Sequence, residues 1–180
     1  MDVLMKRSAY LLAAVLLTAP ALTMAASPSV EVGFSPEGTA RSLVLKTINS
    51  AQHRIRMLSY SFTAPDIMQA LASAKKRGVD VKIVVDERGN RNKSSLAAMN
   101  FIVNQGIPLR TDKHYPIQHD KTIIVDDQTV ETGSFNYTAS AERRNSENVL
   151  VIHNSPDLAR VYTSHWQDRW DKGQDYHSQY

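Results

Sequence analysis

The sequence of 180 residues contains no cysteine. Without cysteine the chain can form no disulfide, no thiolate zinc site and no cysteine nucleophile. After its first two dozen residues it also lacks any apolar run long enough to span a membrane. Charge of one sign is not abundant, because 21 basic side chains face 18 acidic ones. This mild excess of positive charge suits a polyanionic substrate without identifying one. Because no disulfide can form, the stability of the fold must come from packing or oligomerisation.

Residues 1–26 have the layout of a secretory signal peptide. A basic start is followed by an apolar stretch over residues 11–22 and by small residues suited to cleavage near Ala25 or Ala26. We expect a mature domain of residues 27–180, located in the bacterial periplasm or secreted. The alternative is an uncleaved membrane anchor, although the apolar stretch is short for a spanning helix.

Strand-like and helix-like segments alternate through the rest of the chain. Short runs rich in β-branched and apolar residues predict strands over 30–34, 54–62, 81–85, 121–125, 129–133 and 147–152. Apolar residues at helical spacing predict helices over 37–51, 63–78, 96–106 and 155–170. With no repeat and no linker, the alternation predicts a single α/β domain with a mixed β-sheet flanked by helices. Residues 86–93 are expected to form a polar loop, and residues 172–180 a frayed tail.

Polar residues able to carry chemistry gather around the expected hairpin. His119 and Lys121 are two residues apart, so a strand projects both from the same face. Ser134 and Asn136 have the same spacing on the returning chain. An odd separation from Lys121 aims Asp126 the other way, which predicts a structural role in the hairpin turn. The imidazole, ammonium, hydroxyl and carboxamide can therefore converge, and together they can bind and attack a phosphodiester.

Two short motifs and a downstream acid make this grouping specific. In order along the chain they are His119, Lys121, Asp126, Gly133, Ser134, Asn136 and Glu147. The first three fit H-x-K-x4-D and the next three fit G-S-x-N, so the sequence resembles the phospholipase D superfamily. The closest likeness is to its small bacterial endonucleases, which carry one motif per chain, and it extends over about residues 30–170. The resemblance implies the phospholipase D/nuclease-like α-β-α sandwich.

The resemblance also implies a metal-independent phosphodiesterase that needs no cofactor. His119 would attack phosphorus to form a phosphohistidine, which water then hydrolyses. Lys121, Ser134 and Asn136 would bind the phosphate oxygens. Glu147 would accept a hydrogen bond from the far nitrogen of His119 and so fix its tautomer.

The sequence carries this motif only once. The leaving oxygen needs a second proton carrier, which larger members of the superfamily supply from a second motif. No other histidine here is followed two residues later by lysine. We therefore expect a homodimer in which two chains each contribute His119 to one shared site.

Other basic and aromatic residues are candidates for contacts with a nucleic-acid backbone or base. They are Arg88, Arg91, Lys93, Arg110, Tyr115 and Arg143. For any one of them, a solvated surface is the simpler explanation. The expected substrate is DNA, with RNA as a second candidate.

Three alternatives stay open. Phospholipid cleavage of the phospholipase D type would use the same chemistry, although no apolar lid or membrane-binding stretch is evident. An inactive nucleic-acid-binding protein is a second alternative, which a turnover assay would separate. The third is a metal-dependent nuclease with His119, Asp120, Asp126 and Asp127 as ligands, although Lys121 in their midst would repel a cation.

Overall fold

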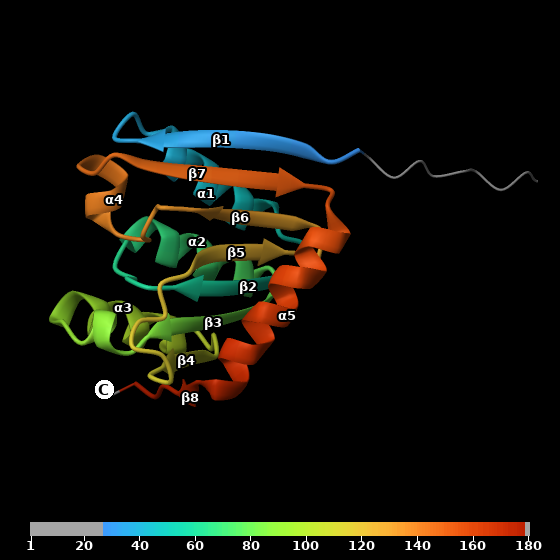
Figure 1. Cartoon of the computed structure of the whole chain (residues 1–180). Coiled ribbons are helices and arrows are strands. Elements are labelled where there is room, and N and C mark those ends of the chain that lie inside the picture. Colours follow the sequence, from blue (N-terminus) through green and yellow to red (C-terminus); the bar gives the residue numbers. More distant parts are fainter. Residues whose placement is uncertain (1–26, 179–180) are drawn as a thin grey trace, which may run out of the picture.

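A mixed sheet of eight strands runs through residues 27–178, the part of the chain that the computed structural model describes (Figure 1). The strand order is β1-β7-β6-β5-β2-β3-β4-β8. The strands are β1 (Ser29–Ser35), β2 (Arg54–Ser59), β3 (Asp80–Asp86), β4 (Leu109–Asp112), β5 (Lys121–Val125), β6 (Thr129–Gly133), β7 (Glu147–His153) and β8 (Gln174–Asp175). The β2–β3 and β3–β4 pairs are parallel and the others antiparallel. The predicted α/β class with a mixed sheet is confirmed.

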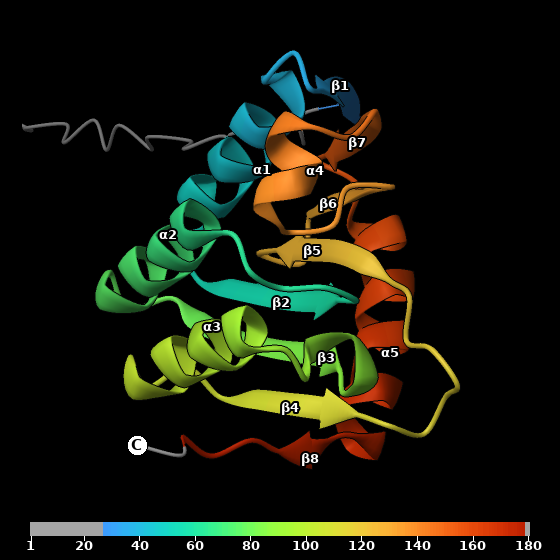
Figure 2. The ribbon, with the colours of Figure 1, turned by 90° about the vertical axis from the view of Figure 1, so that its left-hand side faces the viewer.

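Helices cover both faces of the sheet. They are α1 (Thr39–Ser50), α2 (Pro65–Lys76), α3 (Lys93–Asn104), α4 (Ala139–Arg143) and α5 (Pro156–Lys172). Figure 2 shows α1, α2 and α3 on one side of the sheet and α5 on the other. The central strands are apolar on both faces for this reason. In β3, for example, Val81 and Ile83 pack under the three helices, whereas Val84 packs under α5.

The smaller core lies between the sheet and α5. Trp166 is 2% exposed there and packs against Leu58 and Ile124 from the sheet. Its indole N–H donates to the Met57 carbonyl over 3.1 Å, so the largest buried side chain of α5 is anchored by a hydrogen bond as well as by apolar contact. This anchoring keeps α5 at a fixed position across the middle of the sheet.

Strand ends from distant parts of the chain lie together along one edge of the sheet, which is formed by the ends of strands and is distinct from the outermost strands β1 and β8. The antiparallel register pairs Lys121, the first residue of β5, with Ser59, the last residue of β2. In the same way Glu147, at the start of β7, pairs with Ser35 at the end of β1. The parallel strands β2, β3 and β4 also end at this edge. Ligands of open α/β sheets bind at the carboxyl ends of such strands, so this edge is where a site is expected.

The C-terminal tail differs from the expectation. Residues 174–175 form β8 instead of fraying, and they pair with β4. The Arg110 guanidinium binds Asp175 over 2.6 Å, and the Tyr176 N–H donates to the Leu109 carbonyl over 2.9 Å. The expectation was wrong because residues 174–175 gain strand hydrogen bonds from the neighbouring strand β4. Local composition does not reveal this pairing.

Residues 1–26, where the signal peptide is expected, lie outside the described residues. Within residues 27–178, no helix combines the length and the apolar character needed to cross a membrane.

Candidate active site

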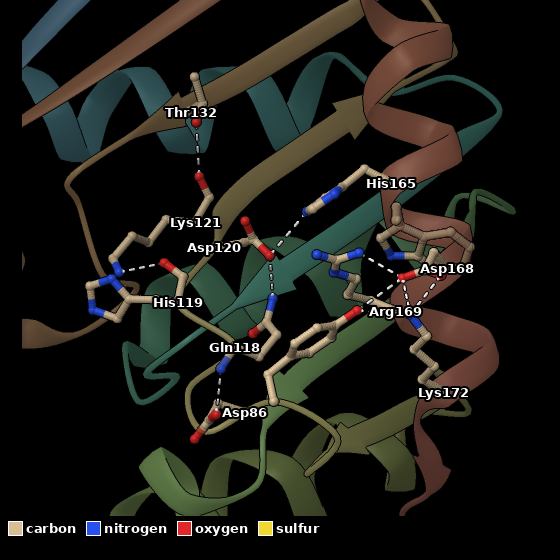
Figure 3. Close-up of polar contacts among 12 residues, drawn as sticks. Asp86, Gln118, His119, Asp120, Lys121, Thr132, His165, Asp168, Arg169 and Lys172 are labelled. Carbon is tan, nitrogen blue, oxygen red and sulfur yellow. Dashed lines mark hydrogen bonds and ion pairs between the residues drawn. The ribbon is translucent and has the colours of Figure 1, made fainter.

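His119 and Lys121 lie side by side at the start of β5. Lys121 continues the face of Ile123 and Val125, which pack in the larger core, and it is 6% exposed. His119 precedes the strand and is exposed. The Lys121 ammonium donates to the His119 carbonyl over 2.8 Å (Figure 3). The sheet edge thus presents an imidazole to solvent with a fixed cation beside it.

Tyr60, which belongs to neither motif, packs against both His119 and Lys121. Its ring centroid lies 4.6 Å from that of His119, and the Lys121 ammonium lies 5.3 Å from the Tyr60 centroid. The Tyr60 N–H donates to the Asp120 carbonyl over 3.0 Å. A side chain at Gly89 would come within 2.9 Å of the Tyr60 ring. Glycine at this position therefore avoids a clash with the ring. The sequence signal was indirect, because Tyr60 follows β2 and reaches the motif only through the β2–β5 register.

Electrostatics act on Lys121 in two directions. Burial lowers the pKa of Lys121 below its usual value, because desolvation disfavours the charged amine. The carboxylates of Asp120 and Glu147 oppose this effect by favouring the ammonium form. The contacts of the Lys121 amine are the His119 carbonyl and the Tyr60 ring, which leaves it able to turn to phosphate oxygens.

Ser134 and Glu147 are directly bonded. The Ser134 hydroxyl donates to Glu147 over 2.6 Å, and it accepts from the Asn148 N–H over 3.0 Å. The second oxygen of Glu147 accepts from Asn145 over 2.9 Å. Any side chain at Gly133 would lie 2.2 Å from the Asn148 carbonyl oxygen. The glycine of the second motif therefore allows β6 and β7 to meet closely enough for these bonds.

No hydrogen bond links Glu147 to His119 in the described chain, so the expected tautomer-fixing contact stays a prediction.

Asn136 lies just beyond Ser134, and its backbone carbonyl accepts from the Thr138 N–H over 2.7 Å. The Asn136 side-chain oxygen is buried and has no partner among the described residues. A buried polar atom of this kind calls for a water or a ligand group.

Asp126 lies at the opposite end of β5. Five residues of strand separate it from Lys121 by about 16 Å. Its carboxylate accepts from the backbone N–H groups of Gln52, His53 and Arg54 at 2.8, 2.8 and 2.7 Å. Burial alone would raise the pKa of Asp126, but these three backbone bonds lower it. The motif aspartate thus ties the hairpin turn to the connection before β2 and does not reach the site.

The same separation bears on the metal alternative. His119 and Asp126 lie at opposite ends of β5, so the ligand set considered from the sequence does not come together. Among the described residues, no three histidine or acidic side chains are grouped as a metal site.

The basic residues around the site differ in how free they are. Arg88 donates to the Pro116 carbonyl over 3.3 Å, and Arg91 pairs with Glu87 over 2.6 Å. Lys93 is exposed at the start of α3, and the Arg143 side chain is 75% exposed on α4. These four residues flank the strand edge and keep exposed charge for a polyanion.

Arg110 and Tyr115 are occupied by contacts within the chain. The Arg110 guanidinium binds Asp175 and lies 4.4 Å from the Trp170 ring centroid. The guanidinium of Arg169 lies 4.6 Å from the Tyr115 ring centroid, and the ammonium of Lys172 lies 5.3 Å from it. The structure therefore places Tyr115 under cations of α5 and not as an open platform for a base.

The chain is similar to several known proteins. Residues 44–170 match the family described as "Cardiolipin synthase, PLD-like domain". A phospholipase D of Rickettsia conorii is 35% identical over 140 residues, which are 78% of this chain and 68% of the relative. A mitochondrial cardiolipin hydrolase of Homo sapiens is 28% identical over 156 residues, which cover 81% of this chain and 60% of the relative. Among solved structures, a phospholipase D family member, Nuc from Salmonella typhimurium, is 67% identical with a TM-score of 0.84, covering 84% of this chain and 100% of that one.

Proposed function

The chain belongs to the phospholipase D superfamily and is a phosphodiesterase, and we propose that it is an exported endonuclease that hydrolyses DNA without a metal ion. The observation that carries this proposal is the exposed imidazole of His119 with the Lys121 ammonium fixed beside it. Ser134 and Asn136 lie at the same sheet edge with polar groups suited to phosphate oxygens. RNA is a second nucleic-acid substrate of the same chemistry.

The reaction proceeds in two displacements. In the first, a ring nitrogen of His119 bonds to phosphorus, the bond from phosphorus to the leaving oxygen breaks, and a general acid protonates that oxygen. Lys121 offsets the negative charge that develops on the non-bridging oxygens. In the second displacement, water attacks phosphorus and gives a proton to the group that acted as general acid in the first step, the bond to His119 breaks, and the phosphate monoester leaves.

Nucleic acid is favoured over phospholipid by the surroundings of the site. Exposed cations lie next to two helices, with Arg91 and Lys93 at the start of α3 and Arg143 and Arg144 at the end of α4. Such an arrangement attracts successive phosphates of a chain. The likeness to single-motif nucleases and the 67% identity to Nuc support the same substrate. Phospholipid cleavage remains the second candidate, because relatives named phospholipase D are 35% identical.

A second copy of the chain would supply the general acid, its own His119. A second copy of the chain would also find an exposed apolar row to cover. On the edge strand β1, Val30, Val32 and Phe34 are 58%, 53% and 52% exposed, which is unusual for three apolar side chains on one sheet face. The proposal also includes export of the chain, with its signal peptide cleaved near Ala25 or Ala26.

The experiment is plasmid degradation by purified mature protein in excess EDTA. We expect nicking by the wild type, none by His119→Ala, and full activity in His177→Ala, which removes an exposed histidine of the tail. Loss of wild-type cleavage on adding EDTA would contradict metal-independent catalysis. Release of headgroup from phosphatidylcholine vesicles, without plasmid nicking, would move the substrate to phospholipid.

A further inference from the structure

The loop that carries His119 is tied to α5. It joins β4 to β5 over residues 113–120, and Figure 3 shows side chains of α5 reaching it at two places. At one of them the Tyr115 hydroxyl donates to Asp168 over 3.2 Å and accepts from Lys172 over 2.8 Å. The other lies next to the candidate nucleophile.

That second tie is made by Asp120 and His165. Because side chains alternate along an extended chain, Asp120 faces α5 while His119 and Lys121 face the opposite side. The Asp120 carboxylate binds the His165 Nε2 over 3.2 Å and accepts from the Gln118 amide over 3.0 Å. The residue between nucleophile and lysine is thereby held through its side chain.

The backbone of the same residue is held as well. The Asp120 carbonyl accepts from the Tyr60 N–H, which fixes it to the end of β2. Two residues earlier, the Gln118 N–H donates to Asp86, the last residue of β3, over 2.8 Å. The segment that places His119 is thus clamped between two strand ends on one side and a helix on the other.

This contact adds little to stability. The side chains of His165 and Asp120 are 37% and 34% exposed, and part-exposed polar contacts contribute weakly because water competes with them and screens any charge. They face a cavity lined also by Val161 and Tyr162, so core packing does not force them together. A weak contact at this position can still matter, because catalysis depends on small displacements that stability does not register.

We propose that His165 and Asp120 are positioning residues, through which α5 fixes the chain between His119 and Lys121 so that imidazole and ammonium address the same phosphate. The proposal rests on the proposed role of His119 as the nucleophile. Neither His165 nor Asp120 needs to touch the substrate. Their contribution is to the rate of the chemical step and not to substrate affinity.

Asp120 has a second effect through its charge. The ionisable groups around the Lys121 ammonium are Asp120, Glu147, His119 and Tyr60. The two carboxylates favour the charged lysine against the effect of its burial. Asp120→Asn keeps an oxygen that can accept from His165 but removes one of these two charges. Position and charge can therefore be separated by substitution.

The position is tested with His165→Leu and His165→Gln, assayed for turnover of bis(4-nitrophenyl) phosphate and for plasmid nicking. Gln can place an N–H donor where His165 has Nε2, and Leu cannot. We expect His165→Leu to lower kcat about tenfold, less than the roughly 100-fold that a 1 Å misplacement costs, with KM and Tm almost unchanged. His165→Gln should restore most of the rate. Gln167→Leu is the matched control, because the Gln167 side chain bonds Asp171 on the same helix.

Several outcomes would overturn this proposal. They are a His165→Leu rate within twofold of wild type, an effect on KM alone, or a His165→Gln variant as slow as His165→Leu. The synthetic diester keeps the two proposals apart: wild type that hydrolyses it without nicking DNA refutes the nuclease proposal and still reports on His165.

The charge is tested by the pH dependence of kcat. In Asp120→Asn the Lys121 ammonium loses one supporting carboxylate, so it deprotonates at lower pH. We expect the alkaline fall in activity to move to lower pH in Asp120→Asn and to stay in place in His165→Leu. An unmoved alkaline limb in Asp120→Asn would refute the electrostatic part, because a merely structural aspartate would change the height of the profile and not its position.

Discussion

At the scale of single residues, Tyr60 sets the immediate surroundings of the candidate nucleophile. Its ring lies against the His119 imidazole and beside the Lys121 ammonium. The ring therefore restricts the angles that both side chains can adopt, and its face favours a cation by about 0.5–1 kcal/mol at a partly exposed position. Gly89 lies against the ring, and the Asp120 carbonyl holds the Tyr60 backbone N–H, so Tyr60 has little room to move.

We predict that Tyr60→Leu lowers kcat about tenfold, because the imidazole loses the flat surface that orients it. Tyr60→Phe keeps the ring and should retain a rate within about twofold of wild type, since ring packing and not the hydroxyl supports His119. Initial rates on plasmid, with Tm as a check on folding, measure both. Equal rates in Tyr60→Leu and wild type would show that the ring has no part in orienting His119.

At the scale of elements, β6 carries a buried acid beneath the site. Glu131 is fully buried and accepts from the Tyr137 hydroxyl over 2.7 Å. Burial raises the pKa of Glu131 to about 8. The Tyr137 carbonyl in turn accepts from the N–H groups of Thr63 and Ala64 at 2.9 Å each. This short chain of bonds holds the segment that follows Asn136 against the start of α2.

Glu131 makes stability depend on pH. Its folded pKa of about 8 exceeds the usual value of 4.5, so between these two values the folded protein holds a proton that the unfolded chain has lost. Stability must fall as pH rises through this window, by about 3 kcal/mol at pH 7 relative to the acid side. We predict that Glu131→Gln removes most of this slope and is more stable than wild type at pH 8.

Urea unfolding at several pH values between about 5 and 8 measures the slope. Glu37→Gln is the matched control, because Glu37 is exposed and its substitution should leave the slope as it is. Parallel curves for Glu131→Gln and wild type would show that Glu131 is already ionised in the folded protein.

The elements differ in how well the sequence predicts them. Runs of apolar and β-branched residues locate β2, β3, β5, β6 and β7, and of these β2, β3 and β5 are buried along most of their length. The sequence pattern misses α4, a five-residue helix capped by the Thr138 hydroxyl, which is too short to show a helical period. It also misses β4 and β8, whose pairing joins residues more than sixty positions apart in the chain.

The site shows the same division. A spacing of two predicts that His119 and Lys121 project together, because that relation is local to one strand. The closeness of Tyr60 to His119 depends on the β2–β5 register, and the covering of Tyr115 depends on where α5 crosses the sheet. The Ser134–Glu147 bond likewise requires two strands to meet at Gly133. Contacts that arise from docking of distant elements are beyond what a local pattern encodes.

At the scale of the whole molecule, the site is open on the side away from the sheet. His119 is exposed at the edge, and the nearby His165 is bound to Asp120 on the α5 side. Two chains related by a two-fold axis through this open edge would bring two imidazoles together. On the proposed mechanism one imidazole would attack phosphorus while the other protonates the leaving oxygen.

This pairing predicts how activity falls when inactive chains are mixed in. If each site needs His119 from both chains, a heterodimer of wild type and His119→Ala is inactive. Activity then follows the square of the wild-type fraction, so an equal mixture that has exchanged subunits keeps about a quarter of the wild-type rate. Independent sites would keep about half.

The measurement uses two affinity tags and co-expression, so that heterodimers are purified away from both homodimers. A wild-type/His119→Ala heterodimer should be nearly inert, whereas a wild-type/His177→Ala heterodimer should match the wild type. Sedimentation at assay concentration gives the oligomeric state of the same samples. A fully active monomer, or a heterodimer with half the wild-type rate, would mean that one chain completes its own site, and the proton for the leaving oxygen would then have to come from water or from a group of that chain.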